Sequence, residues 1–105
     1  MFSLPRNVKV YVAIAPCDMR KQCNGLANTV QATLGKQPRS GDIFVFRNRR
    51  GDLVKLLFFD QQGYCVLAKR LDAGTFKWPC SENEKVSIDS PSLAKLLCDI
   101  RRKNE

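Results

Sequence analysis

The sequence predicts an α+β domain in which a mainly antiparallel sheet carries two helices. Three observations support this fold class: two consecutive hairpin signals, an amphipathic segment near the C-terminus, and a strand followed by a helical pattern near the N-terminus. A chain of 105 residues has the size of one domain, because folding at this length hides roughly two-thirds of the surface of the unfolded chain. We therefore expect residues 1–105 to form a single domain.

The N-terminal part predicts a strand and then a helix. Residues 8–15 are rich in β-branched and aromatic side chains, as strands are. Asp18 is placed to cap a helix over residues 19–34, in which apolar residues recur at helical spacing, and Gly35 is placed to end it. Gly25 costs about 1 kcal/mol relative to alanine inside a helix, so we expect it to permit a close approach to a strand.

A three-stranded central meander is predicted over residues 42–71. The turns at residues 48–51 and 60–63 each begin with Asn or Asp and end with Gly, as type I turns closed by a left-handed glycine do. With each glycine as a bulge residue, the expected pairs are Arg47 with Asp52, Val45 with Val54, Phe59 with Tyr64, and Leu56 with Leu67.

This register gives the meander two apolar faces, and both need cover from the rest of the chain. The first face carries Ile43, Val45, Val54, Leu56, Phe58, Cys65, Leu67 and Leu71, with Arg47, Asp52 and Lys69 near one end. The second carries Phe44, Phe46, Leu53, Leu57, Phe59, Tyr64, Val66 and Ala68, interrupted by Lys55 and Arg70.

The last part of the chain predicts a short strand over residues 85–88 and a helix over residues 91–102. Ser90 is in position for the N-cap, and Pro91 suits the first helical residue. Apolar residues then follow at i, i+3, i+4 and i+7, which makes one stripe that must dock on the sheet. Before these elements, Trp78 is favoured as a lid over the core rather than as a base-stacking platform.

The charge balance favours an anionic partner. Eighteen Lys and Arg residues face 10 Asp and Glu residues, so the net charge is +8. Nucleic acids lead the candidates, and acidic protein surfaces are the alternative. No membrane role is expected, because the chain has neither a long apolar run nor a basic amphipathic segment with an aromatic side. The N-terminal apolar stretch favours a strand over a signal peptide, so we expect a cytoplasmic protein.

No catalytic site, metal site or cofactor is predicted. The chain contains no His, and its carboxylates have turn, cap or ion-pair explanations. Asp52 and Asp60 could not share a two-metal site, because one strand separates them by about 25 Å. A zinc site would need four of the 5 scattered cysteines, so reduced thiols are expected. The cysteines are Cys17, Cys23, Cys65, Cys80 and Cys98.

Basic residues grouped around the first turn of the meander form a predicted nucleic-acid-binding set. Guanidinium groups fit phosphate in a bidentate manner and stack on bases. Arg20 and Lys21 fall in the first turn of the predicted helix, where the helix dipole disfavours cations, and this cost suggests a use elsewhere. Solvated turn charges are the alternative interpretation. The set is Arg20, Lys21, Arg47, Asn48, Arg49, Arg50, Lys69 and Arg70.

Several motifs resemble those of a known family. The strings DMRK at residues 18–21 and FVFRNRR at residues 44–50 are the most specific. With further matches from about Leu4 to Leu97, the chain resembles the small TnpB accessory protein, the second open reading frame, of the IS sixty-six type of bacterial insertion sequence. The chain departs from the family pattern at Cys17 and Cys23, which replace larger apolar residues, and at Phe59, which replaces a common Trp.

The resemblance implies a role in transposition of a mobile element, a form of DNA recombination, beside a separate transposase and without catalysis by this chain. RNA-guided nucleases that share the TnpB label are several times longer and carry an acidic triad that is absent here. Two hypotheses follow. The first is an accessory protein that binds DNA at the element ends or the target through the basic set. The second is an adaptor that docks on the transposase or another accessory protein of the element through an incompletely covered apolar sheet face.

Overall fold

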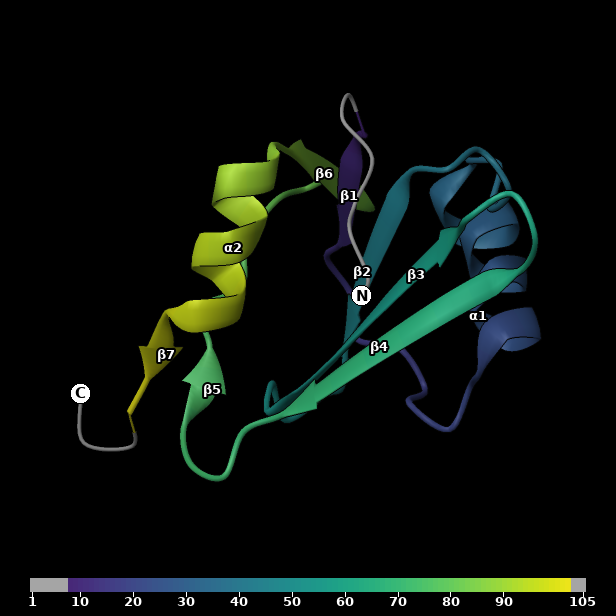
Figure 1. The fold of residues 1–105 in the computed structure, drawn as a ribbon. Coiled ribbons are helices and arrows are strands. Elements are labelled where there is room, and N and C mark those ends of the chain that lie inside the picture. The colour runs from purple at the N-terminus through teal and green to yellow at the C-terminus, as the bar shows by residue number, and fades with distance from the viewer. Residues whose placement is uncertain (1–7, 103–105) are drawn as a thin grey trace.

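A five-stranded sheet organises the chain in the computed structural model, which describes residues 8–102. The strand order is β4-β3-β2-β1-β6, in which β1 and β2 run parallel and the other neighbours antiparallel (Figure 1). The strands are β1 (Val10–Ala13), β2 (Ile43–Arg47), β3 (Leu53–Phe59), β4 (Tyr64–Arg70) and β6 (Lys85–Ile88). The α+β class, the meander over residues 42–71 and the strand over residues 85–88 are confirmed.

Helices on both faces of the sheet explain why its central strands are apolar throughout. The segments α1 (Cys23–Thr29) and η1 (Val30–Leu34), a π-helix, cover one face, and α2 (Ser90–Cys98) covers the other (Figure 1). The core between the sheet and the segments α1 and η1 consists of Tyr11, Ala13, Leu26, Ala27, Val30, Leu34, Phe44, Phe46 and Leu57. The core on the α2 side of the sheet consists of Val10, Val12, Ile43, Val45, Val54, Leu56, Phe58, Leu71, Phe76, Leu93 and Leu96. The predicted division of the meander into two apolar faces is therefore confirmed.

The register of the β3–β4 hairpin is confirmed, but that of the β2–β3 hairpin is wrong by two residues. Leu56 pairs with Leu67 as predicted. Val45, however, pairs with Leu56 rather than Val54, and Arg47 pairs with Val54 rather than Asp52. The loop is longer than a type I turn with one bulge, because Asn48 N donates to Leu53 O at 3.1 Å. A shift of two residues keeps every side chain on its face, so the core is unaffected.

The first helix begins later than predicted. Its N-cap is Gln22, whose side chain makes no capping bond, so residues 19–22 precede the helix and Asp18 does not cap it. The C-terminal end agrees with the prediction, because Gly35 takes the left-handed conformation with φ 64°. Gly25 does not serve a close approach to a strand. A Cβ there would meet the side chain of Lys21 at 3.1 Å.

The second helix is capped one residue earlier and ends four residues sooner than predicted. Asp89, not Ser90, is the N-cap, and its Oδ1 accepts from Ser92 N at 2.8 Å. The helix ends at Cys98, because Asp99 is extended and the next residues pair with an earlier strand. These residues form β7 (Ile100–Arg101), which pairs with β5 (Thr75–Phe76) in a small separate sheet.

None of the helices within residues 8–102 is long and apolar enough to cross a membrane.

Candidate nucleic-acid interface

The β2–β3 turn is ordered by a single side chain. Asn48 Oδ1 accepts from the backbone N–H groups of Gly51 at 2.9 Å, and of Asp52 and Leu53 at 3.1 Å each. Asn48 Nδ2 also donates to Asp52 Oδ1 at 2.6 Å, and this bond, more than the nearby Arg50, lowers the pKa of Asp52. Gly51 has φ 79°, a left-handed conformation that favours glycine. The amide of Asn48 thus builds a rigid loop rather than facing solvent.

Arg49 and Arg50 lie at the tip of this turn and are exposed. No hydrogen bond or ion pair joins either guanidinium to another of the residues 8–102. Gly51 O, next along the chain, accepts from Phe76 N at 2.9 Å, so the loop rests on β5. The two arginines are therefore presented to solvent on a backbone that is fixed from both sides.

Arg47, by contrast, is occupied within the protein. Its Nη2 and Nε donate to Ile14 O at 3.0 and 3.3 Å, and its guanidinium lies 5.9 Å from the ring centroid of Trp78. Trp78 Nε1 in turn donates to Ala13 O at 2.8 Å, and its ring packs against the core as a lid, as expected from the sequence. These contacts clamp the segment after β1 to the end of β2.

Lys69 and Arg70, at the end of β4, also have partners. Lys69 Nζ donates to Leu97 O at 2.7 Å, near the C-terminal end of α2, where a cation is favourable to the helix dipole. Arg70 Nη1 lies 3.9 Å from Asp52 Oδ2, and its side chain remains 64% exposed. An exposed pair at that distance is weak, so Arg70 can exchange this partner for another anion.

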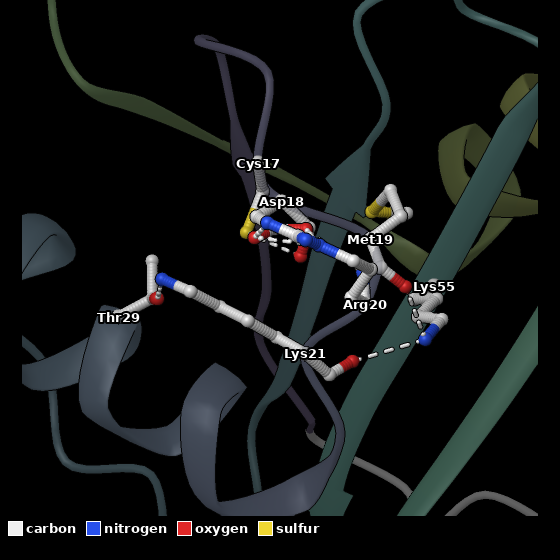
Figure 2. Close-up of polar contacts among 7 residues, drawn as sticks. All are labelled: Cys17, Asp18, Met19, Arg20, Lys21, Thr29 and Lys55. Atoms are coloured by element: carbon white, nitrogen blue, oxygen red, sulfur yellow. Dashed lines mark hydrogen bonds and ion pairs between the residues drawn. The ribbon is translucent and has the colours of Figure 1, made fainter.

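A turn formed by residues 17–21 lies beside the hairpin (Figure 2). Cys17 N donates to Arg47 O at 2.8 Å and joins the turn to the end of β2. Asp18 accepts from Arg20 Nε at 3.0 Å and from Nη2 at 2.9 Å, and these bonds lower the pKa of Asp18 to about 2. Arg20 precedes the helix and has this local partner, so the predicted conflict with the helix dipole does not exist.

Lys55 is the polar residue whose role could not be inferred from the sequence. Its side chain is only 6% exposed, and Nζ donates to Met19 O at 2.8 Å and to Lys21 O at 2.9 Å (Figure 2). Lys21 Nζ reaches in the other direction and donates to Thr29 Oγ1 in α1 at 3.0 Å (Figure 2). A buried ammonium needs such bonds to offset the loss of water. Strand β3 thus holds the turn in place through Lys55.

The signal for Lys55 was present in the sequence as a lone cation within LVKLLFF. Its carbonyl partners come from a turn 34 and 36 residues away, and only folding brings them together. Burial raises the pKa of the Cys17 thiol in this turn. The five thiols are free. Within residues 8–102, no three His, Cys, Asp or Glu side chains are arranged to hold a metal ion.

The structure brings the whole predicted set to one end of the sheet, where β2 and β4 end and β3 begins. It also divides the set into two groups. Lys21, Arg47, Asn48 and Lys69 hydrogen-bond to backbone groups or to the Thr29 hydroxyl and so help to build the fold. The guanidinium groups that remain exposed are those of Arg49 and Arg50, which have no hydrogen-bond or ion-pair partner within residues 8–102, and those of Arg20 and Arg70, each of which is paired with one aspartate.

Comparison with known proteins gives the chain its family. A family model described as IS66 Orf2-like protein matches residues 8–105. The uncharacterized protein y4hO of Sinorhizobium fredii (strain NBRC 101917 / NGR234) is 42% identical over 95 residues, which cover 90% of this chain and 83% of that protein. The uncharacterized protein y4jC of the same strain is 37% identical over 100 residues, which cover 95% of this chain and 86% of that protein. No solved structure matches the chain significantly. The resemblance inferred from the sequence is confirmed, and the chain belongs to the IS66 Orf2-like family.

Proposed function

We propose that this protein is a non-catalytic accessory protein of DNA transposition that binds DNA through the tip of the β2–β3 hairpin. Its family implies an accessory protein of an insertion sequence, associated with the transposition machinery of that element. In this proposal Arg49 and Arg50 contact phosphates, and Arg70 and Arg20 extend the contact along the same end of the sheet. The DNA is that of the element ends or the target.

The observation that carries the proposal is the contrast between a fixed backbone and free cations at the tip. Ordering a loop before binding removes an entropic cost that a flexible loop would incur on association. The side-chain amide of Asn48 supplies that order, and the exposed Arg49 and Arg50 supply the charge. Guanidinium groups suit phosphate because they present a planar fork of donors.

The test is a salt titration of duplex binding with the variant Arg49→Gln/Arg50→Gln. If each arginine neutralises one phosphate, the slope of log affinity against log salt should fall by about 1.8, taking about 0.9 per contact. The stability of the domain should change by about 0.5 kcal/mol or less, because both residues are exposed in a turn. Element-end and random duplexes should be compared at each salt concentration.

A matched control removes the same charge elsewhere. Lys9→Gln/Lys95→Gln changes two exposed cations, one just before β1 and one on α2. This control should leave the slope close to that of the wild type, because neither residue lies at the hairpin tip. Equal slopes for the wild type and the hairpin variant would return Arg49 and Arg50 to the role of solvated turn charges.

An adaptor function is the second candidate, because one large apolar side chain is exposed on an edge strand. Leu67 in β4 is 50% exposed, and β4 is the last strand on its side of the sheet. Such an edge can accept a strand from another chain, here the transposase or the other accessory protein. Loss of transposase capture by Leu67→Ser, with unchanged DNA binding, would favour this function over the first.

A further inference from the structure

A polar groove lies at the opposite end of the sheet from the hairpin arginines. Its volume is about 420 Å³, and it lies between α1 and η1, the loop before β2, and the start of β4. Figure 1 shows the β3–β4 turn beside these helices. The polar lining residues are Asn24, Asn28, Gln31, Gln37, Arg39 and Tyr64. A volume of this size is in the range of small-ligand sites, which span roughly 300–1,000 Å³.

Three of the amide side chains that line the groove come from one helical segment. Asn24, Asn28 and Gln31 follow one another at i, i+4 and i+7, so one face of the helical segment presents them together. All three are exposed, and within residues 8–102 their side-chain amides make no hydrogen bond. An amide offers both a donor and an acceptor, the combination that matches the edge of a nucleobase.

Arg39 and Tyr64 supply the stacking surface beside these amides. The Arg39 guanidinium lies 5.1 Å from the ring centroid of Phe59 and 5.9 Å from that of Tyr64. The two rings are themselves in edge contact, with centroids 5.2 Å apart. The guanidinium is thereby held at the groove, and it is the only charge among those lining residues that belong to the described part of the chain, residues 8–102. Unpaired bases stack on aromatic rings and on guanidinium planes in this way.

We propose that this groove binds an unpaired nucleobase of single-stranded DNA. Arg39 and Tyr64 stack against the base and attract the adjoining phosphate, and Asn28 and Gln31 hydrogen-bond the base edge. The inference rests on the proposed DNA-binding function and adds a second site to it, at the far end of the sheet. The hairpin contacts the phosphate backbone, and the groove distinguishes unpaired from paired DNA.

The test compares three labelled DNAs by fluorescence anisotropy at fixed salt: a single strand of about 10 nucleotides, the same backbone without bases, and a duplex. The wild type should bind the single strand roughly fivefold or more tightly than the abasic strand, because one stacked base contributes about that factor or more. Asn28→Ala/Gln31→Ala should reduce this preference, because the base edge loses its hydrogen bonds while the stacking surface remains, and should leave duplex binding unchanged. Both positions are exposed and helical, so alanine should keep the fold, which a thermal melt checks.

Two variants of Arg39 test the contribution of its positive charge separately from that of its planar guanidinium group. Arg39→Gln should reduce the salt slope on single-stranded DNA by about 0.7. Arg39→Lys should keep the slope and still lose the preference for bases, because an ammonium does not stack as a guanidinium does. Asn83→Ala, an exposed amide before β6 at the other edge of the sheet, is the matched control and should change neither quantity.

Three results would overturn the groove assignment. One is equal wild-type affinity for the base-bearing and abasic strands, and another is a preference that is undiminished in Asn28→Ala/Gln31→Ala. The third is displacement of the single strand by poly-glutamate as readily as by unlabelled DNA, which would assign the groove to acidic proteins. Duplex binding that depends on Arg49 and Arg50 would persist in these cases, whereas failure of the wild type to bind any DNA would remove the proposed function itself.

Discussion

The two hairpins of the meander carry the same sequence signature, but their turns adopt different conformations. In the first, Asn48 binds three backbone N–H groups and Gly51 takes the left-handed conformation. In the second, Asp60 binds the N–H groups of Gln62 at 3.1 Å and Gly63 at 3.0 Å. The left-handed residue there is Gln61 with φ 83°, so the prediction of a left-handed glycine at position 63 is wrong.

The difference shows that a turn signature indicates a hairpin without specifying its length. Asn48 has both a donor and an acceptor, so it can close a wide loop by also donating to Asp52. Asp60 accepts only, and a short loop with Asp60 N bonded to Gly63 O at 3.0 Å results. The wide loop leaves room for two exposed arginines at its tip, which is the feature on which the proposed function depends.

The largest expected effect is on the strand that both hairpins share. Leu56 lies in the middle of β3 and is 6% exposed. Leu56→Ala should lower the free energy of unfolding by about 2–5 kcal/mol, because it leaves a cavity under α2. Denaturant melts measure the loss. A value under about 1 kcal/mol would contradict the position of Leu56 in the core.

Lys55, on the same strand, tests how the turn at residues 17–21 is held. Lys55→Met keeps most of the side-chain volume but leaves Met19 O and Lys21 O without a donor. We expect a loss of about 1–3 kcal/mol and faster hydrogen exchange in the turn. Lys55→Arg is the comparison that keeps the charge. If Lys55→Met is as stable as the wild type and the turn exchanges no faster, the ammonium does not hold it.

The direct test of the two-hairpin comparison is to truncate the first residue of each turn. Asn48→Ala should cost about 0.5–2 kcal/mol, as the loss of a helix N-cap does, because three N–H groups lose their acceptor. Asp60→Ala should cost less, because fewer groups depend on it. The measurement is the midpoint of urea unfolding for both variants. An equal or larger effect for Asp60→Ala would break the comparison.

The smallest expected effect is on acid sensitivity. Backbone hydrogen bonds lower the pKa of Asp60, so its charged form stabilises the fold and the contribution is present above the unfolded pKa of about 4. This contribution is lost as the pH falls through the lowered pKa. In Asp60→Asn the free energy of unfolding should therefore fall less steeply with decreasing pH than in the wild type. Urea melts below about pH 5 measure this dependence.

In the first hairpin the equivalent turn position is already an asparagine, Asn48, and an asparagine side chain does not titrate. The acid sensitivity of that end of the molecule comes instead from Asp52, whose pKa is lowered by the hydrogen bond from Asn48, and from Asp18, whose pKa lies at about 2 beside Arg20. Asp18→Asn should flatten stability between about pH 4 and pH 2. If the free energy of unfolding depends on acid pH in the same way in the wild type, in Asp60→Asn and in Asp18→Asn, neither carboxylate contributes to the acid sensitivity of the fold.

Local patterns in the sequence were sufficient to predict much of the secondary structure and the faces of the sheet. Alternation of apolar residues placed the meander and assigned each side chain to its face, because the two-residue period of a strand survives an error of two in register. Helical spacing located both helices, and the basic residues of the FVFRNRR string indicated the end of the sheet at which cations gather. All of these depend on neighbours within a few residues.

Only the tertiary structure decided which of these cations are free. Arg47 is occupied by Ile14 O and Lys69 by Leu97 O, partners that lie 33 and 28 residues away in the chain. Lys55 can be buried because carbonyl groups distant in the chain accept hydrogen bonds from its ammonium group. The guanidinium of Arg39 packs against aromatic rings from the second hairpin. A charged side chain looks the same in the sequence whether it is exposed or satisfied. Its state is set by the desolvation cost and by the partners that the fold supplies, and neither is local.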